Sequence, residues 1–251
     1  MAQSNEKHCL LAYRCQLAGG SSCNNHCPHF IALHGMNAKG GRAGLTGVPS
    51  DYRLVTLTNS PVRASQPKIY EILDKYAATF GRQFEEIGDR IKSVYMWSKS
   101  PGTGKTTTAA ALLNDWLVAH YLGSLKRDRQ PLQQPAYFLD VNEFQMRYNL
   151  ATMTNDDAEL STIRKLIEMC QRVPFIVMDD IGVRGASEAF RAYLHAIINH
   201  RAVNGLPTIY TSNLPIEELA RVFDERLYDR VRDMCMQLHF DGESKRGKRR
   251  G

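Results

Sequence analysis

Apolar residues along this chain recur with two spacings, one typical of helices and one typical of strands. Helical patterns, with apolar residues three or four positions apart, cover Lys68–Phe80, Thr106–His120, Leu160–Cys170, Phe190–Arg201 and Ile216–Arg232. Short apolar runs predict strands at Ser93–Trp97, Ala136–Leu139, Pro174–Met178, Thr208–Thr211 and Met236–Phe240. Because strands and helices alternate, we expect an α/β fold in which helices cover both faces of a parallel sheet.

Composition divides the 251 residues into four parts. Residues 1–35 are rich in Cys and His, and residues 36–50 contain several glycines and few large apolar side chains, which predicts a flexible linker. Residues 51–242 form a globular part that is long enough to bury a core. Residues 243–251 form a basic tail.

The formal net charge is +6, and five of the positive charges lie in the last eight residues, at Lys245, Arg246, Lys248, Arg249 and Arg250. The body of the chain is therefore nearly neutral, and net charge alone argues weakly for nucleic-acid binding. The tail is either a phosphate-binding segment or a solvated end. No apolar run approaches the roughly 18 residues that span a membrane, and the N-terminus lacks the apolar run of a signal peptide. We expect a soluble cytoplasmic protein with no membrane partner.

A glycine-rich loop joins the strand predicted at Ser93–Trp97 to the helix that follows it. A strand before and a helix after such a loop are the context that a phosphate-binding P-loop requires. Backbone N–H groups at the glycines and at the helix N-terminus would surround phosphate oxygens. The predicted binding residues for ATP are Pro101, Gly102, Thr103, Gly104, Lys105, Thr106 and Thr107.

Two side chains of this loop have specific expected roles. Lys105 is predicted to contact the β- and γ-phosphates, and the hydroxyl of Thr106 is predicted to bind Mg²⁺. The loop departs from the usual pattern at Lys99, where a glycine is normally found. The alternative is a glycine-rich turn that binds no ligand.

The strand predicted at Pro174–Met178 is followed by two carboxylates, Asp179 and Asp180. Ligands bind at the carboxyl ends of strands in open α/β sheets. Asp179 is therefore predicted to hold Mg²⁺, and Asp180 to orient the attacking water. The alternative is a polar turn without a catalytic role.

Three polar residues further along the chain are candidates for the same site. Asn213 follows the strand predicted at Thr208–Thr211 and would contact the γ-phosphate or water, although it would equally serve as a helix cap. Arg226 and Arg230 are four positions apart and share one helix face. One of them is predicted to stabilise charge at the nucleotide of a neighbouring subunit. The alternative is a pair of surface arginines bonded to nearby acids.

Together these segments resemble the AAA+ replicative helicase loaders of the DnaC/DnaI type from bacteria and phages. The segments that carry the resemblance lie in the expected order between Pro49 and Gly242: Pro-Gly-Thr-Gly-Lys-Thr, Met-Asp-Asp-Ile-Gly, Pro-Thr-Ile-Tyr-Thr-Ser-Asn-Leu and Glu-Arg-Leu-Tyr-Asp-Arg. Many AAA+ proteins carry Asp-Glu on the acidic strand, whereas this group carries Asp-Asp. The resemblance implies a three-layer P-loop AAA+ ATPase with little or no helical lid, and only 38 residues follow Asn213.

The resemblance further implies an ATP-hydrolysing loader that binds a hexameric replicative DNA helicase and single-stranded DNA in replication initiation. It implies an ATP-dependent homo-oligomer, in which Asn213 is the first sensor and Asp179 and Asp180 complete the hydrolytic site. Arg230 is the preferred finger acting in trans, with Arg226 as the alternative. Arg246, in the basic tail, is the expected second sensor.

Three other functions stay open. Transposase helper ATPases of the IstB type share this core and bind duplex DNA, but their N-terminal region is usually basic and helical. A P-loop metabolite kinase would act alone and need no arginine from a neighbour. A nucleotide-sensing zinc adaptor would show negligible turnover.

Four of the six cysteines lie within the first 27 residues: Cys9, Cys15, Cys23 and Cys27. Four thiolates can form a closed tetrahedral Zn²⁺ site, with His26 or His29 as substitute ligands. A segment this short is not expected to form a core, so a metal would supply its folding energy. Because some loaders hold the helicase through a zinc-bearing N-terminal region, we expect residues 1–35 to bind the helicase. The alternative is a disordered arm with incidental cysteines.

Phe144, Arg147 and Tyr148 follow the strand predicted at Ala136–Leu139. Aromatic and basic side chains of this kind stack on single-stranded DNA and pair with its phosphates. Helical spacing equally places Phe144 and Tyr148 in the core.

Overall fold

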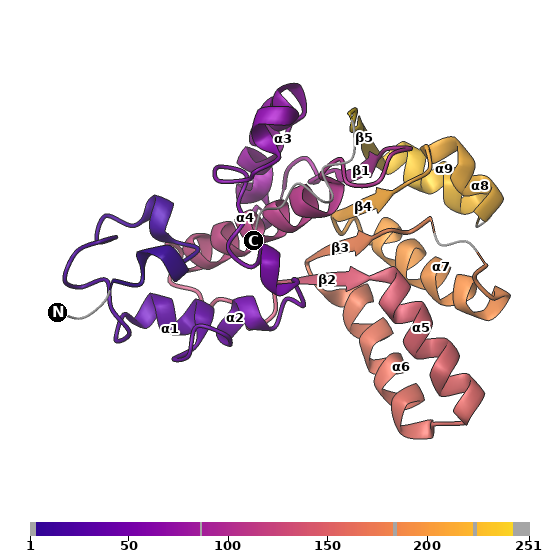
Figure 1. The fold of residues 1–251 in the computed structure, drawn as a ribbon, viewed down its shortest axis with the longest axis horizontal. Coiled ribbons are helices and arrows are strands. Elements are labelled where there is room, and N and C mark those ends of the chain that lie inside the picture. The colour runs from indigo at the N-terminus through magenta and orange to yellow at the C-terminus, as the bar shows by residue number, and fades with distance from the viewer. Residues whose placement is uncertain (1–3, 86, 183–184, 223–224, 243–251) are drawn as a thin grey trace.

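The computed structural model describes residues 4–85, 87–182, 185–222 and 225–242. Within these residues, five strands form one parallel sheet in the order β2-β3-β4-β1-β5 (Figure 1). The strands are β1 (Ser93–Trp97), β2 (Ala136–Asp140), β3 (Phe175–Asp179), β4 (Thr208–Ser212) and β5 (Cys235–His239). Because β3, β4 and β1 are neighbours and all run in the same direction, their carboxyl ends meet at one edge of the sheet.

Helices fill most of the connections between these strands. The described helices are α1 (Pro28–His34), α2 (Gly41–Gly44), α3 (Pro67–Ala78), α4 (Lys105–Leu125), α5 (Val141–Thr154), α6 (Asp157–Arg172), α7 (Glu188–Val203), α8 (Leu219–Val222) and α9 (Glu225–Met234). Short 3-10 turns occupy Glu6–His8, Ala12–Arg14, Ser50–Tyr52, Arg63–Ser65, Thr79–Phe84 and Ile216–Glu218. None of the described helices has the length and apolar character needed to cross a membrane.

Local side chains set the starts of three of these helices. The carboxylates of Asp140 and Asp156 accept from the N–H groups of Glu143 and Glu159, at the N-termini of α5 and α6. Ser187 caps α7 in the same way. Such caps satisfy N–H groups that have no partner inside the helix.

The two faces of the sheet are covered by different helices. Figure 1 shows α3 and α4 on one side of the strands and α5, α6 and α7 on the other. Alternate residues of each strand enter the two cores, as the period of two requires. On β3, for example, Val177 packs in the cluster with α3 and α4, whereas Ile176 and Met178 pack in the cluster with α5, α6 and α7.

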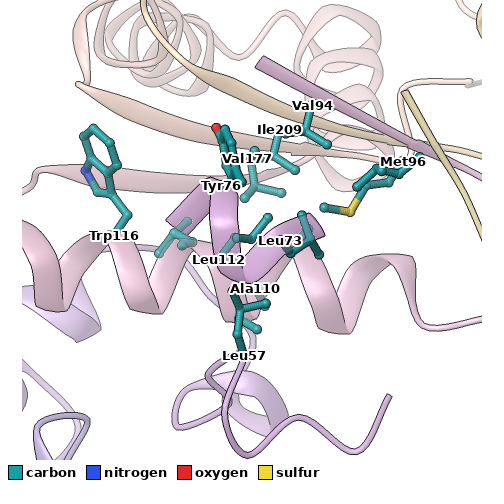
Figure 2. Packing of buried hydrophobic residues seen from close by; sticks show 14 of the residues in the cluster. Leu57, Leu73, Tyr76, Val94, Met96, Ala110, Leu112, Trp116, Val177 and Ile209 are labelled. Atoms are coloured by element: carbon teal, nitrogen blue, oxygen red, sulfur yellow. The ribbon is translucent and has the colours of Figure 1, made fainter. Parts of the chain in front are cut away.

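Helix α4 carries the phosphate loop at its N-terminus and is buried along most of its length. Figure 2 shows Leu112 of α4 on the side that faces Val177 and Ile209 of the sheet, and Ala110 beside Leu57 on the opposite side of the helix. Of its 21 residues, 15 are buried, so the helix is enclosed on nearly all sides. The phosphate loop is therefore fixed to a rigid central helix.

The N-terminal part of the chain also packs against α4. Leu10, Leu11, Leu33 and Ala43 form a small core with Leu117, Val118 and Tyr121 of α4. The segment 36–50, expected to be a flexible linker, contains α2 and the buried Arg42. The guanidinium of Arg42 donates to the carbonyl oxygens of Ala32, Pro131 and Leu132 at 2.9–3.0 Å. These contacts hold the segment on the main α/β fold, because burying the cation requires that its N–H groups be bonded.

All five strands predicted from the sequence are present, and each observed boundary lies within one residue of the predicted one. The helix predicted at Ile216–Arg232 is instead divided into a 3-10 turn, α8 and α9. Helix α5 was not predicted as an element, and its apolar residues do not form a strong amphipathic pattern. Its N-cap, Asp140, is also the last residue of β2, so strand and helix follow each other without a loop.

Candidate nucleotide-binding site

The phosphate loop lies between β1 and α4, as the sequence predicts. Gly102 and Gly104 have φ values of 74° and 102°, a region that favours glycine. A Cβ atom at Gly104 would lie 2.5 Å from Cγ1 of Val62, so the segment before α3 covers the loop closely. The loop is tied to β4, because Ser98 N–H donates to the carbonyl oxygen of Ser212 at 3.2 Å.

Lys105 lies at the bottom of the loop and is only 7% exposed. Its ammonium donates to the carbonyl oxygen of Ser100 at 3.4 Å and to Oδ1 of Asn213 at 3.1 Å. A buried ammonium requires such partners, and a phosphate oxygen would be a stronger one. The structure thus brings Lys105 and Asn213 together, as predicted.

Thr106 and Asp179 also meet, although 73 positions separate them. The Thr106 hydroxyl lies 3.1 Å from both carboxylate oxygens of Asp179. A hydroxyl and a carboxylate are oxygen ligands of the kind that Mg²⁺ prefers. The donor set therefore fits Mg²⁺.

Asp179 is 8% exposed, and burial raises its pKa to about 6. Hydrogen bonds from Thr211 and Thr106 act against this rise, and the charge of Asp180 adds to it. A buried carboxylate without a cation beside it is costly. A divalent cation at this position would remove that cost.

Asp180 follows β3 in the left-handed region, with φ at 59°. Its two carboxylate oxygens accept from the side-chain amides of Asn142, at 2.9 Å, and Asn213, at 3.1 Å. Asn213 thereby links Asp180 to Lys105 through its amide group. Asn213 does not act as a helix cap here, because Pro215 precedes the turn that begins at Ile216.

One buried hydroxyl of the loop fits a phosphate ligand. Thr103 is 3% exposed, and its Oγ1 is one of two buried side-chain polar atoms without a hydrogen-bond partner in the described part of the chain. Buried polar groups are rarely left without a partner. An oxygen of a bound triphosphate would supply one.

The arginines predicted to act in trans do not join this site in the same chain. Arg230 is an exposed residue of α9, and it lines a small cavity with residues at the amino ends of the strands, including Ser93 and Thr208. The nucleotide site lies at the opposite, carboxyl ends. Arg226 belongs to α9, but its side chain lies outside the described residues. Arg246 also lies outside the described residues.

The residues considered for DNA contacts belong largely to the protein interior. Phe144 is 2% exposed and packs against Phe190. Tyr148 contacts Phe190 and Tyr193. Arg147 forms an ion pair with Glu159 at 2.8 Å. The core interpretation of Phe144 and Tyr148 is therefore confirmed.

The zinc prediction for Cys9, Cys15, Cys23 and Cys27 has no support in the structure. All four thiols are free, and together they line a cavity of about 160 Å³. In the described part of the chain, no three His, Cys, Asp or Glu side chains are placed to hold a metal ion. Apolar contacts with α4 anchor this segment.

Sequence reasoning missed two residues that shape the site. Asn142 lies in the first turn of α5, and Thr211 is the residue before Ser212 on β4. Asn142 lies two residues after the end of β2, and a polar residue so close to a strand end was the available signal. Thr211 belonged to a predicted strand, and nothing in its spacing distinguishes it from a core threonine.

No protein-family model matches the chain. Two curated relatives are the replicative helicase loaders DnaC of Escherichia coli K12, 26% identical over 62% of this chain, and DnaI of Bacillus subtilis, 23% identical over 68%. The matched stretch spans 57% of DnaC and 53% of DnaI, so the chain corresponds to little more than half of each relative.

Solved structures show the same fold at low sequence identity. A crystal structure of DnaI is matched with a TM-score of 0.58 and 21% identity, over 82% of this chain and 99% of that chain. The replication initiator DnaA, bound to AMPPCP and single-stranded DNA, is matched with a TM-score of 0.51 and 18% identity, over 78% and 51%. The chain therefore carries an AAA+ P-loop domain similar to those of the DnaC/DnaI-type replicative helicase loaders.

Proposed function

We propose that this protein is an ATP-dependent loader of a replicative DNA helicase. In this proposal it binds ATP with Mg²⁺, hydrolyses the γ-phosphate bond, and binds a hexameric helicase and single-stranded DNA in replication initiation. Nucleotide binding favours an assembly of several copies, and turnover removes that bias.

The observation that carries the proposal is the hydrogen-bonded group formed by Lys105, Thr106, Asp179, Asp180 and Asn213 at one edge of the sheet. These residues come from three separate segments of the chain. Each would have one role with a bound triphosphate: Lys105 neutralises phosphate charge, Thr106 and Asp179 hold the metal, and Asp180 orients water. Bound Mg²⁺ would supply charge stabilisation at the phosphates.

The similarity to DnaC and DnaI supports the choice of partner. Both relatives are named as replicative helicase loaders, and the structural neighbour DnaA was solved with a nucleotide analogue and single-stranded DNA. The exposed position of Arg230, far from its own nucleotide site, is compatible with action on a neighbouring copy. The transposase-helper alternative gains no support from these relatives.

The test is affinity capture of the tagged protein from its native host with ATP and Mg²⁺, using Lys105→Ala as the matched control. We expect a replicative helicase to co-purify with the wild type and to be depleted with the variant. ATP turnover is measured in parallel with single-stranded and duplex DNA. Capture of a transposase, together with stimulation by duplex DNA alone, would favour the helper ATPase instead.

A further inference from the structure

Thr211, a residue of β4, contacts both acidic residues at the end of β3. Its hydroxyl donates to Oδ1 of Asp179 at 2.6 Å and accepts from the N–H of Asp180 at 2.9 Å. Its carbonyl oxygen accepts from the N–H of Ile181 at 2.9 Å. Thr211 is 1% exposed, so water has little access to replace these bonds.

The conformation of Asp180 depends on these contacts. A residue other than glycine is strained in the left-handed region, and surrounding interactions must offset that strain. The N–H of Asp180 and that of Ile181 are both bonded to Thr211. They hold the chain in the turn that directs the Asp180 carboxylate toward the amides of Asn142 and Asn213.

The parallel pairing of β3 and β4 explains why Thr211 occupies this position. Met178 lies beside Tyr210 in the register, so the next residues, Asp179 and Thr211, are also neighbours. A hydroxyl that both donates and accepts is needed here, because one partner is a carboxylate and the other is an N–H group. Valine, which has nearly the same shape, would satisfy neither.

We propose that Thr211 is a positioning residue of the nucleotide site, whose hydroxyl orients Asp179 toward the metal and fixes the turn that places Asp180. It touches neither the nucleotide nor the reacting water and acts through the two carboxylates. The inference rests on the proposed function, because it takes this site as an ATP-binding site.

The test compares Thr211→Val with Thr211→Ser. We expect the valine variant to lower kcat for ATP about tenfold and to raise the Mg²⁺ concentration for half-maximal nucleotide binding about threefold or more. The serine variant keeps the hydroxyl and should remain within about twofold of wild type in both measurements. If Thr211 only filled space in the core, serine would not restore kcat and the Mg²⁺ dependence.

The matched control is Thr208→Val, the same substitution at the amino end of β4. In the wild type, the hydroxyl of Thr208 accepts from Nε of Arg201 and donates to the carbonyl oxygen of Leu206, away from the nucleotide site. This variant should lower the melting temperature while kcat per folded molecule stays unchanged. Should Thr211→Val not fold, Thr211→Ala replaces it in the comparison with Thr211→Ser, because that pair differs only in the hydroxyl.

The outcomes separate this inference from the proposed function. Suppose that the wild type binds Mg²⁺–ATP and that a hydroxyl-free variant matches it within twofold in kcat and in Mg²⁺ dependence. This outcome overturns the role of Thr211 and leaves the proposed function standing. The role of Thr211 is also overturned if Thr211→Ser loses as much kcat and Mg²⁺ affinity as Thr211→Val. A wild type that neither binds nor hydrolyses ATP overturns the proposed function, and the inference with it.

Discussion

At the scale of single residues, the site is organised by side chains that form a continuous series of hydrogen bonds. Lys105 donates to Asn213, and Asn213 donates to Asp180. A phosphate oxygen that took over the bond from Lys105 would leave the oxygen of Asn213 available to another donor. The amide of Asn213 would then link the proposed phosphate site to Asp180.

The role of Asp180 can be tested separately from binding. We expect Asp180→Asn to lower ATP turnover by about 100-fold or more, because an amide does not accept a proton from water as a carboxylate does. The nucleotide Kd should change by no more than about threefold, since Thr106 and Asp179 remain in place. Steady-state turnover and equilibrium binding of a fluorescent ATP analogue measure the two effects. Asp157→Asn, an exposed residue of α6, is the control. Equal loss of binding and turnover in Asp180→Asn would contradict the assigned role.

At the scale of elements, one buried arginine joins three of them. Arg201, near the end of α7, is 0% exposed. Its guanidinium donates to the carbonyl oxygens of Cys170, Val173 and Pro207 and to the hydroxyl of Thr208, at 2.7–2.9 Å. It therefore connects the end of α6, the approach to β3 and the start of β4. These hydrogen bonds fix the amino ends of β3 and β4, and the candidate nucleotide site lies at the carboxyl ends of the same two strands.

Removing this connection should destabilise the whole domain. We expect Arg201→Met to lower the free energy of unfolding by about 3 kcal/mol or more, because three buried carbonyl groups lose their donors. Urea denaturation followed by circular dichroism measures the change. Arg172→Met, at an exposed position of α6, should change stability by about 0.5 kcal/mol or less. A similar small effect at Arg201 would show that the buried guanidinium contributes little.

The N-terminal segment should make stability depend on pH. His34 is buried in α1, where its Nε2 accepts from the N–H of Leu10 at 3.0 Å. Burial, with a smaller contribution from the charge of His8, lowers the pKa of His34 from 6.5 to about 4. The neutral form is favoured in the folded state, so this stabilisation is complete above pH 6.5 and is lost as the pH falls toward 4.

The expected loss is roughly 3 kcal/mol over that range, an upper figure for one histidine. Unfolding midpoints measured between pH 7.5 and pH 4.5 should fall more steeply for the wild type than for His34→Gln, which keeps an acceptor but does not titrate. Because burial also lowers the pKa of His120 to about 4, His120→Gln gives the second comparison. Parallel pH curves for the wild type and His34→Gln would contradict this account.

At the scale of the whole molecule, the nucleotide site and the candidate finger lie at opposite ends of the sheet. A single chain does not bring Arg230 to its own Lys105, because Arg230 lines a cavity with residues that begin β1 and β4. In a spiral or ring of copies, one subunit would present this end to the nucleotide of the next. Such an arrangement makes turnover depend on assembly.

Mixing two inactive variants tests this arrangement. Arg230→Ala keeps an intact nucleotide site, whereas Lys105→Ala keeps an intact arginine. If Arg230 acts in trans, an equal mixture should recover a measurable share of wild-type turnover, on the order of a quarter for random pairs. Each variant alone should remain near background. The same mixing with Arg226→Ala distinguishes the two arginines, and absence of recovery with either would remove the role.

The sequence by itself determined the order of the strands and the candidate residues at their carboxyl ends. The glycine pattern of the loop and the apolar run before Asp179 are local signals, because phosphate binding and strand burial each impose their own residue types. Lys105, Thr106, Asp179, Asp180 and Asn213 could therefore be named in advance, and the structure brings all five together.

Only the tertiary structure decided which residues support that site and where the N-terminal segment lies. Thr211 and Asn142 contact Asp180 from other segments, and such contacts arise from strand register and helix placement, not from a local pattern. The helices of the first 50 residues, α1 and α2, have seven and four residues, which is shorter than the roughly 11-residue window over which a helical period is recognised. Only the tertiary structure shows that apolar side chains of this segment complete a core with α4.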